Sequence, residues 1–297
     1  MTSSADGRVR IGIVGLGNIG TYHAEFLADV EAAALVAGLD IDADARESFA
    51  ETFDVDTYAD RGDLFDDVDA VIVTTPNRFH EDYAVAALDA GVDVLLEKPL
   101  AHTLESAERI AAAAEASDAL CMVGFNNRFA NPVEVLKHDL RTGRFGDVTH
   151  VEANYVRRRG IPGRGSWFTS KDVAGGGALI DIGVHAIDLA LYFLDFPDVV
   201  EVSGTTRAEF GEREDYAFLR QWGADEGPGG FDVEDSASAF VRCADGQTIS
   251  LEVAWAANRP DTDEFVIRGT EAGATLDRNS HELTTYDAGV GGANHLS

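Results

Sequence analysis

The sequence predicts an α/β protein in two parts, a doubly wound parallel sheet followed by an α+β domain with antiparallel strands. Three observations predict this fold class. From Val9 to about Gly124, short apolar runs alternate with segments of helical composition. Beyond Gly124, helical segments come first and strand-like segments follow them. Asp245-Gly246, between two of the late strands, is a strong signal for an antiparallel hairpin.

The first part, residues 1–124, contains five apolar runs that are typical of strands. They are Val9–Val14, Ala34–Leu39, Ala70–Thr74, Val92–Leu96 and Ala119–Val123. The segments of helical composition between them are Tyr22–Val30, Ala43–Phe53, Glu81–Ala90 and Thr103–Ala116. Because strands this apolar are buried on both faces, the alternation indicates a parallel sheet covered by helices on both sides.

The second part, residues 125–297, has a different order of elements. Helices are expected over Pro132–Thr142 and Ala178–Leu194, with a strand over Val148–Arg157 and a glycine-rich loop between them. Further strands are expected over Val199–Arg207, Ser236–Val241, Gln247–Trp255 and Glu264–Arg268. A run of helices followed by a run of strands predicts an α+β domain.

The charge of the chain limits its partners. The 297 residues carry a formal net charge of −30, and a field of that sign repels nucleic acid and anionic membrane surfaces. Only three lysines (Lys98, Lys137 and Lys171) occur beside 20 arginines. Abundant Asp with scarce Lys is typical of proteins that work in molar salt, where screening suppresses self-repulsion. We therefore expect a halophilic protein that binds neither nucleic acid nor membranes.

Cysteines and terminal segments indicate the compartment. Cys121 and Cys243 are too few for a disulfide framework or a thiolate metal site. The segment Met1–Arg8 is polar and lacks the apolar core of a signal peptide. No stretch reaches the roughly 18 apolar residues expected of a membrane span. The sequence therefore predicts a cytoplasmic protein.

A glycine motif follows the first predicted strand and precedes a helical segment. Gly15 allows a tight turn, Gly17 lets backbone amides approach a pyrophosphate, and Gly20 lets helix and strand pack closely. The helix start at Asn18 and Ile19 would present free N–H groups and a positive dipole end to the anion. In this strand–turn–helix context, the motif predicts dinucleotide binding.

Asp40 ends the second predicted strand, 20 residues after Gly20. A carboxylate there would accept hydrogen bonds from the adenosine ribose and repel a 2′-phosphate, which favours NAD(H) over NADP(H). The alternative is a solvated loop acid, since Asp42 and Asp44 follow closely.

Two further strand ends carry candidate ligands. Thr75-Pro76-Asn77 and His80 follow one of them; they are candidates for cofactor contact, although Asn77 could serve only as a helix N-cap. Glu97 and Lys98 follow the next strand. Ligands bind outside such carboxyl ends, so we expect both residues near the cofactor and Lys98 near the substrate. The alternative for Lys98 is a loop lysine paired with an acid.

A stripe of polar residues marks the long apolar helix. Asp181, His185 and Asp188 are spaced at i, i+4 and i+7 and so share one face of a helix. Polar groups aligned in this way are costly to bury unless they are paired or face a cleft. They indicate either a proton-transfer pair or a buried Asp–His pair that only orients the helix. The lack of Cys or His-x-His spacing argues against a metal.

Arg157 opens the densest cationic stretch of the chain, and Trp167 follows it closely. An arginine fork could recognise an anionic group of a substrate, and Trp167 could line a sugar pocket. The alternatives are surface arginines that balance nearby acids and an indole that packs under its own loop.

Three motifs, in this order, resemble those of the Gfo/Idh/MocA family of sugar and inositol dehydrogenases. They are Gly15-x-Gly17-x-x-Gly20, Glu97-Lys98-Pro99, and Gly175-Gly176-Gly177 followed by Asp181-x-Gly183-x-His185-x-x-Asp188. The resemblance covers roughly residues 8–276. It implies an N-terminal Rossmann domain and a C-terminal domain whose large open, mostly antiparallel sheet mediates assembly into a homodimer or homotetramer. It also implies that Lys98, Asp181 and His185 act together on the substrate.

The end of the chain departs from this pattern. The family would lead us to expect closing helices after the strands, whereas the sequence ends in the glycine-rich segment Asp287–Ser297. We therefore expect a C-terminal domain without those helices.

Together the motifs predict an NAD-dependent dehydrogenase of a sugar, polyol or related hydroxyl compound. His185 would take the hydroxyl proton, a role that suits an imidazole near neutral pH. Lys98 would stabilise negative charge on the reacting oxygen, and Asp181 would balance Lys98 or hold the imidazole. Two other classes stay open: an NAD-dependent glycoside hydrolase that oxidises its substrate transiently, and a non-catalytic NAD-binding regulator.

The charge pattern predicts that salt stabilises the protein. We expect the melting temperature to rise on transfer from dilute buffer to molar KCl, because a Debye length of about 3 Å at 1 M screens the repulsion among the acidic side chains. Scanning calorimetry at several KCl concentrations measures this. A melting temperature that falls or stays constant would contradict the halophilic assignment.

Overall fold

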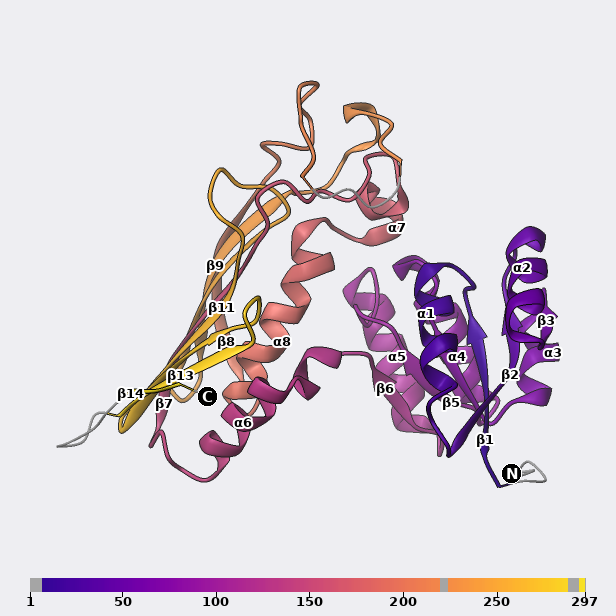
Figure 1. The fold of residues 1–297 in the computed structure, drawn as a ribbon, viewed down its shortest axis with the longest axis horizontal. Coiled ribbons are helices and arrows are strands. Elements are labelled where there is room, and N and C mark those ends of the chain that lie inside the picture. Colours follow the sequence, from indigo (N-terminus) through magenta and orange to yellow (C-terminus); the bar gives the residue numbers. More distant parts are fainter. Residues whose placement is uncertain (1–6, 220–223, 288–293, 297) are drawn as a thin grey trace. The chain divides into compact units, whose positions relative to one another are not determined.

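The computed structural model describes residues 7–219, 224–287 and 294–296. Most of Met1–Arg8 and most of Asp287–Ser297 therefore lie outside the described residues, so the expectations about the two ends are not tested. The chain divides into two compact units, Met1–Gly124 and Phe125–Ser297, which Figure 1 shows in sequence colours.

The first unit contains a parallel sheet in the order β3-β2-β1-β4-β5-β6. Its strands are β1 (Val9–Val14), β2 (Ala33–Leu39), β3 (Asp56–Tyr58), β4 (Ala70–Val73), β5 (Asp93–Leu96) and β6 (Cys121–Val123). Its α-helices are α1 (Asn18–Leu27), α2 (Ala43–Phe53), α3 (Arg61–Asp67), α4 (His80–Asp89) and α5 (Leu104–Ala116). The predicted doubly wound parallel sheet is confirmed.

Alternate side chains of β4 show why both faces of this sheet are covered. Val71 and Val73 belong to a buried cluster that includes Leu88 of α4 and Ile110 of α5. Ile72, between them, belongs to a separate cluster with residues of α1 and α2. Because successive side chains of a strand point to opposite faces, an uninterrupted apolar strand must have helices on both sides.

The sequence does not predict two elements of this unit, β3 and α3. Asp60 caps the start of α3 by accepting a hydrogen bond from the Gly62 amide. Leu64 is the buried residue of this seven-residue helix, so no apolar periodicity marks it. The start of α1 also differs, because the helix begins at Asn18, directly after the glycine turn, and not at Tyr22.

The second unit contains a sheet of eight described strands in the order β14-β13-β12-β11-β7-β10-β9-β8. The pair β7–β10 is parallel, and the other recorded pairs are antiparallel. The strands are β7 (Val148–Val156), β8 (Val199–Arg207), β9 (Ser236–Cys243), β10 (Thr248–Ala254), β11 (Thr262–Gly269), β12 (Ala272–Asp277), β13 (Glu282–Asp287) and β14 (Asn294–Leu296). The predicted large, mostly antiparallel sheet is confirmed, and the last three strands were not predicted.

The hairpin signal at Asp245-Gly246 lies where it was expected. Gly246 has a φ of +90°, a conformation that glycine adopts without steric penalty. The strands on either side, β9 and β10, pair antiparallel along their whole length.

The helices of the second unit are α6 (Asn131–Arg141), α7 (Lys171–Ala174) and α8 (Val184–Phe193). The predicted long helix is present, but its first turn, Leu179–Gly183, is π-helical. By length and composition the helical run Lys171–Phe193 could cross a membrane, with a mean hydropathy of 1.4 over its best window. The sequence analysis expected no segment long and apolar enough to span a membrane, so this helical run differs from that expectation. More than half of that window is buried inside the structure, as in a core helix.

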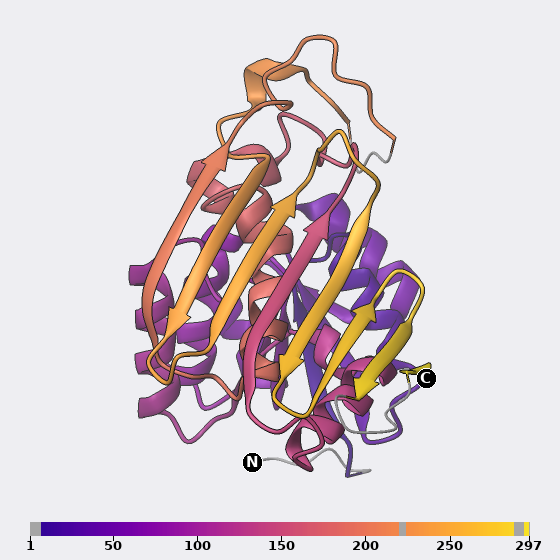
Figure 2. The same cartoon turned by 90° about the vertical axis from the view of Figure 1, so that its left-hand side faces the viewer.

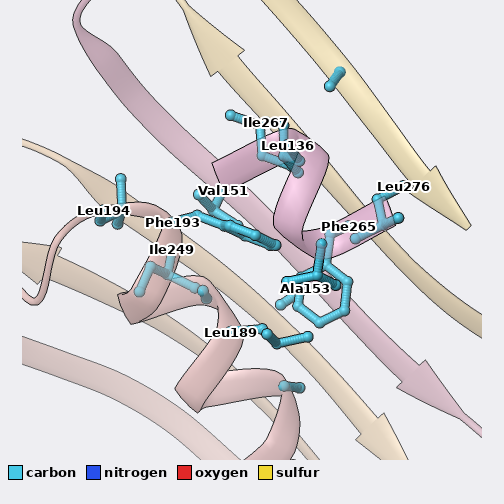
Figure 3. Close-up of a cluster of buried hydrophobic side chains, with 14 of the residues drawn as sticks. Leu136, Val151, Ala153, Leu189, Phe193, Leu194, Ile249, Phe265, Ile267 and Leu276 are labelled. Carbon is cyan, nitrogen blue, oxygen red and sulfur yellow. The ribbon is translucent and has the colours of Figure 1, made fainter. Parts of the chain in front are cut away.

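The core of the second unit lies between α6, α8 and one face of the sheet. Figure 3 shows Leu189 and Phe193 of α8 and Leu136 of α6 beside strand residues such as Val151 and Phe265. The rings of Phe193 and Phe265 meet edge to face with centroids 5.9 Å apart. Both side chains are almost fully buried, so this contact joins the helix layer to the centre of the sheet.

The opposite face of the sheet is seen in Figure 2, where the described strands lie side by side and no described helix covers them. Along β8, every residue from Val199 to Thr206 is exposed. Val200 and Val202 are more than half exposed, as is usual for a sheet edge that another surface can cover.

The core contact predicts a large stability difference between two phenylalanines. Phe265→Ala should lower the free energy of unfolding by about 3–5 kcal/mol, because the substitution leaves a cavity in a closed core. Phe240→Ala on β9 is the matched control, since its ring is about half exposed, and its loss should be much smaller. Urea unfolding followed by circular dichroism measures both. Similar losses of stability for the two variants would contradict the burial of Phe265 in a closed core.

Candidate active site

The glycine turn after β1 is built on close backbone approaches. Gly15 has a φ of +93°, and the Thr74 hydroxyl donates a 2.6 Å hydrogen bond to its carbonyl. A Cβ at Gly20 would lie 2.1 Å from the Gly15 carbonyl oxygen, so α1 can start this close to the turn only with glycine. These contacts join the turn after β1 to the end of β4, at the point where the strand order reverses.

The start of α1 can receive an anion. Gly17 is the N-cap and no side chain caps the described helix, so the first amides have no side-chain partner. A Cβ at Gly17 would meet no atom within 4 Å, which leaves open space beside the turn. Asn18 and Ile19, the first two helical residues, are exposed there. These features fit the pyrophosphate of a dinucleotide.

Asp40 lies beside this turn. Its Oδ2 accepts a 2.8 Å hydrogen bond from the Leu16 amide and its Oδ1 accepts one of 2.9 Å from the Asp42 amide. A carboxylate offers about four acceptor positions, so both oxygens retain capacity for ribose hydroxyls. The structure thus supplies a second role for Asp40, which is to hold the glycine turn against the end of β2.

The end of β4 presents a hydroxyl without a partner. Thr75 Oγ1 is buried and, among the described residues, has no hydrogen-bond partner. A buried hydroxyl is normally bonded, so this atom fits a polar group of a bound cofactor. The Pro76 side chain beside it is half-buried, whereas Asn77 is buried at the start of a 3₁₀ turn.

His80 contacts the backbone of two loops, the one after β4 and the one after β5. It is 1% exposed, and its Nδ1 and Nε2 each lie 2.9 Å from a carbonyl oxygen, of Pro99 and Thr75 respectively. Burial lowers the pKa of His80 below its ordinary value and outweighs these hydrogen bonds, which raise it. The structure places His80 beneath the loops after β4 and β5, where it holds their backbones together.

Glu97 links the start of the loop after β5 to α1. Its Oε1 lies 2.8 Å from Nε2 of His23, and its Oε2 accepts a 3.1 Å bond from the Lys98 amide. Burial by itself would raise the pKa of Glu97, but the bond to His23 and the charges of His23 and Lys98 lower it overall. Lys98 is half-buried and is followed by a cis peptide to Pro99. Glu97 therefore positions the backbone of Lys98.

Asp181 lies in the π-helical turn of the second unit and faces the sheet. Its Oδ2 accepts a 2.8 Å bond from the indole Nε1 of Trp255, which is fully buried. Arg157 Nη1 lies 4.0 Å from the same oxygen. Arg157 Nη2 also donates to the Tyr155 hydroxyl, so its guanidinium is held against the inner face of β7.

His185 and Asp188 face the segment that begins the second unit. The His185 ring meets Phe125 edge to face at 6.2 Å. Asp188 is buried and binds Arg128 through both carboxylate oxygens. The Arg128 guanidinium also lies over the rings of Phe125 and Tyr192. Asp188 is therefore a structural anchor, and this anchor holds Phe125 beside His185.

The three polar residues of the helix thus have different surroundings. A π turn hydrogen-bonds from i to i+5, so the i, i+4 spacing of an α-helix does not carry across it from Asp181 to His185. Asp181 meets Trp255, whereas His185 and Asp188 meet the segment from Phe125 to Arg128. Among the described residues, no group of three or more His, Cys, Asp or Glu side chains could hold a metal ion.

The loop after β7 is organised by Arg164. This arginine is 3% exposed. Its Nε and Nη2 donate to the Asp225 carboxylate, and its Nη1 donates to the backbone carbonyls of Gly211 and Arg213. Trp167 stacks on Phe168 at 3.8 Å, and both rings are half-buried. Trp167 is therefore partly exposed, whereas the guanidinium of Arg164 is bonded within the fold.

Sequence reasoning missed three residues that support these candidates: His23, Arg128 and Trp255. His23 follows the glycine motif on α1, where a polar residue in a helix that packs on the sheet is a weak signal. Arg128 and Trp255 carry no local signal, because their partners Asp188 and Asp181 are 60 and 74 residues away.

Comparison with known proteins places both units in one family. Residues 9–125 match the model described as "Oxidoreductase family, NAD-binding Rossmann fold". Residues 133–275 match the model of the "GFO/IDH/MocA C-terminal domain". Together the two matches span most of the chain.

Individual relatives act on sugars, according to their names. The D-glucoside 3-dehydrogenase of Escherichia coli is 32% identical over 282 residues, which cover 93% of this chain and 78% of the relative. A protein of Amycolatopsis mediterranei assigned as a UDP-kanosamine synthase oxidoreductase subunit is 34% identical over 90% of this chain and 75% of its own length. A levoglucosan dehydrogenase solved with NADH and L-sorbose has a TM-score of 0.86 at 26% identity, covering 98% of this chain and 80% of that one.

The burial of His80 predicts a specific pH effect on stability. A histidine whose folded pKa is lowered binds its proton more weakly than in the unfolded chain, so stability is lost as the pH falls below about 6.5. His80→Gln should reduce this loss, by at most about 1.4 kcal/mol for each pH unit. His138→Gln, at an exposed position, is the control.

Urea unfolding at pH 7.5 and pH 5.5 measures the effect for the wild type and both variants. An unchanged pH dependence in His80→Gln would contradict the lowered pKa of His80 as its cause.

Proposed function

Because this chain belongs to the GFO/IDH/MocA oxidoreductase family and is an NAD-dependent oxidoreductase acting on CH–OH groups, we propose that it oxidises a hydroxyl group of a sugar or polyol with His185 as base. The observation that carries the proposal is the pairing of a dinucleotide cradle in the first unit with the Asp181–His185 helix in the second. A protein that only bound NAD would need the first and not the second.

The cofactor contacts come from the strand ends of the first unit. The pyrophosphate would be held by the backbone amides at the start of α1, those of Asn18, Ile19 and Gly20, as expected at a helix start. Asp40 accepts from the adenosine ribose, which favours NAD over NADP. Thr75 Oγ1 would bond a polar group of the cofactor, and Pro76, Asn77, His80 and Glu97 shape the loops that would carry these contacts. When bound, the cofactor supplies the acceptor for a hydride.

The proton chemistry comes from three side chains. His185 accepts the proton of the substrate hydroxyl as its carbon is oxidised, and a positioned base contributes about 10²–10⁴-fold to rate. The Lys98 ammonium stabilises negative charge on that oxygen. Asp181, whose carboxylate is bonded by the Trp255 indole, is assigned to balance the Lys98 charge or to hold the imidazole. Lys98 and His185 belong to different units, so the proposal requires both to reach one hydroxyl when cofactor and substrate are bound.

Substrate recognition is assigned to Arg157 and Trp167. The Arg157 guanidinium contacts Tyr155 and lies near Asp181, so it donates to neutral hydroxyls of a sugar more readily than it binds a free anion. The partly exposed indole of Trp167 packs on the apolar face of a sugar ring. A D-glucoside or a related glycoside fits both groups, and the named relatives are consistent with this class.

The open face of the second sheet is assigned to self-association. The exposed valines of β8 and the uncovered strands of Figure 2 support a homodimer or homotetramer formed through this sheet. The salt dependence expected of so acidic a chain applies to this interface as well.

The function is tested by absorbance at 340 nm with NAD⁺ and a panel of glycosides, free sugars and polyols in molar KCl. We expect net NADH with at least one glycoside or polyol. Release of an aglycone without net NADH would replace this proposal with a hydrolase, and neither signal with any member of the panel would leave a non-catalytic NAD-binding protein.

The catalytic assignment predicts the effect of two substitutions. Lys98→Ala and His185→Ala should each lower kcat by about 10²–10⁴-fold, because each removes a group that acts on the reacting oxygen. The affinity for NADH, followed by fluorescence titration, should change by less than about threefold in His185→Ala. The controls are Lys171→Ala and His138→Ala, at exposed positions. Full activity in either catalytic variant would refute its assigned role.

A further inference from the structure

The helix that carries Asp181 and His185 starts against a dipeptide from a distant part of the chain. Glu234 Oε1 accepts hydrogen bonds from the amides of Gly177 and Leu179, both 2.9 Å long. The Glu234 carbonyl accepts a third bond, of 3.0 Å, from the Ala178 amide between them. Three successive amides at the start of the helix are thus bonded to a single residue.

The glycines before the helix make this contact possible. A Cβ at Gly177 would lie 1.9 Å from the Glu234 carbonyl oxygen, a distance that no side chain can occupy. Gly177 is therefore required by the approach of Glu234, without any direct contact to a ligand.

The next residue, Asp235, fixes the other side of Asp181. Its carbonyl oxygen accepts a 2.8 Å bond from the Trp255 amide, and the Trp255 indole donates to Asp181. Asp235 is itself fully buried, and its Oδ2 accepts from the amides of Phe210 and Gly211. The Glu234-Asp235 dipeptide therefore determines both the start of the helix and the position of the indole that binds the Asp181 carboxylate.

We infer that Glu234 is a positioning residue for the reaction: it sets the π-helical turn so that the Asp181 carboxylate and the His185 imidazole meet the substrate in a reactive geometry. The inference rests on the proposed function of Asp181 and His185. Glu234 acts through its acceptor oxygen, because the bonds it receives come from backbone amides and need no negative charge.

Three single variants separate this role from a general effect on folding. Glu234→Ala removes the side-chain acceptor of Gly177 and Leu179, whereas Glu234→Gln retains a carbonyl oxygen at the same position. Asp232→Ala is the matched control: Asp232 lies in the same segment and accepts a backbone bond from the Lys171 amide, but at the start of α7, which carries no proposed catalytic residue.

We expect kcat to fall roughly 10- to 100-fold in Glu234→Ala, because small misplacements of reacting groups have effects of this size. Glu234→Gln should recover most of the activity, and Asp232→Ala should stay near the wild type. The affinity for NADH should be unchanged in all three. Equal losses in the Ala and Gln variants, or a loss in Asp232→Ala as large as in Glu234→Ala, would overturn the inference.

A double-mutant cycle tests whether Glu234 acts through Asp181. In an Asp181→Asn background, Glu234→Ala should have less than about a threefold further effect, since residues that act as a unit are not additive. Full additivity of the two losses would contradict the inference.

Hydrogen exchange gives a readout that does not depend on activity. Glu234→Ala should raise exchange of the amides of Gly177 and Leu179, which bond the Glu234 side chain, and Glu234→Gln should not. If the wild type oxidised no sugar or polyol, the proposed function would fail. The positioning role of Glu234 would then be judged from hydrogen exchange alone. If exchange in Glu234→Ala stayed at the wild-type level, the positioning would fail whatever the activity.

Discussion

The helical segment from Leu179 to Phe193 must bury an apolar face and still carry three polar side chains. Leu189 and Phe193 are buried against the sheet, so the helix cannot rotate without opening the core. An unpaired carboxylate in such a position would be strongly destabilising, and each one meets a partner from elsewhere in the unit: Arg128 binds Asp188, and Trp255 binds Asp181. Because core packing and polar pairing both fix the rotation of the helix, its functional groups are held on a rigid element.

Close backbone contacts play the corresponding part in the first unit. The turn after β1 is bonded to the ends of β2 and β4 through Asp40 and Thr74, and the loops after β4 and β5 are joined by His80. The bond between His23 and Glu97 ties the latter loop to α1. The carboxyl ends of four neighbouring strands thus form one connected frame, and Lys98 is part of it.

Sequence patterns predicted what depends on local periodicity, and tertiary partners account for the rest. The strands of the first unit other than β3, the glycine turn and the long helix were predicted because apolar runs and glycines mark them directly. α3 and β12 were missed because small or acidic residues hide their pattern. Neither the π turn at Asp181 nor the burial of Arg164 could be predicted, because both depend on residues far along the chain, Glu234 and Asp225. His80 was predicted as a cofactor ligand from its position, and its burial gives it a second role as a support for the loops after β4 and β5.

Transfer of deuterium from substrate to cofactor tests whether this protein oxidises a sugar hydroxyl by hydride transfer. A glycoside that is oxidised in the absorbance assay would be prepared with deuterium on each hydroxyl-bearing ring carbon in turn, and the reduced cofactor would be analysed by proton NMR. We expect that one labelled position, and no other, delivers its deuterium to C4 of the nicotinamide. Reduced cofactor that carries only protium at C4 with every labelled substrate would contradict it.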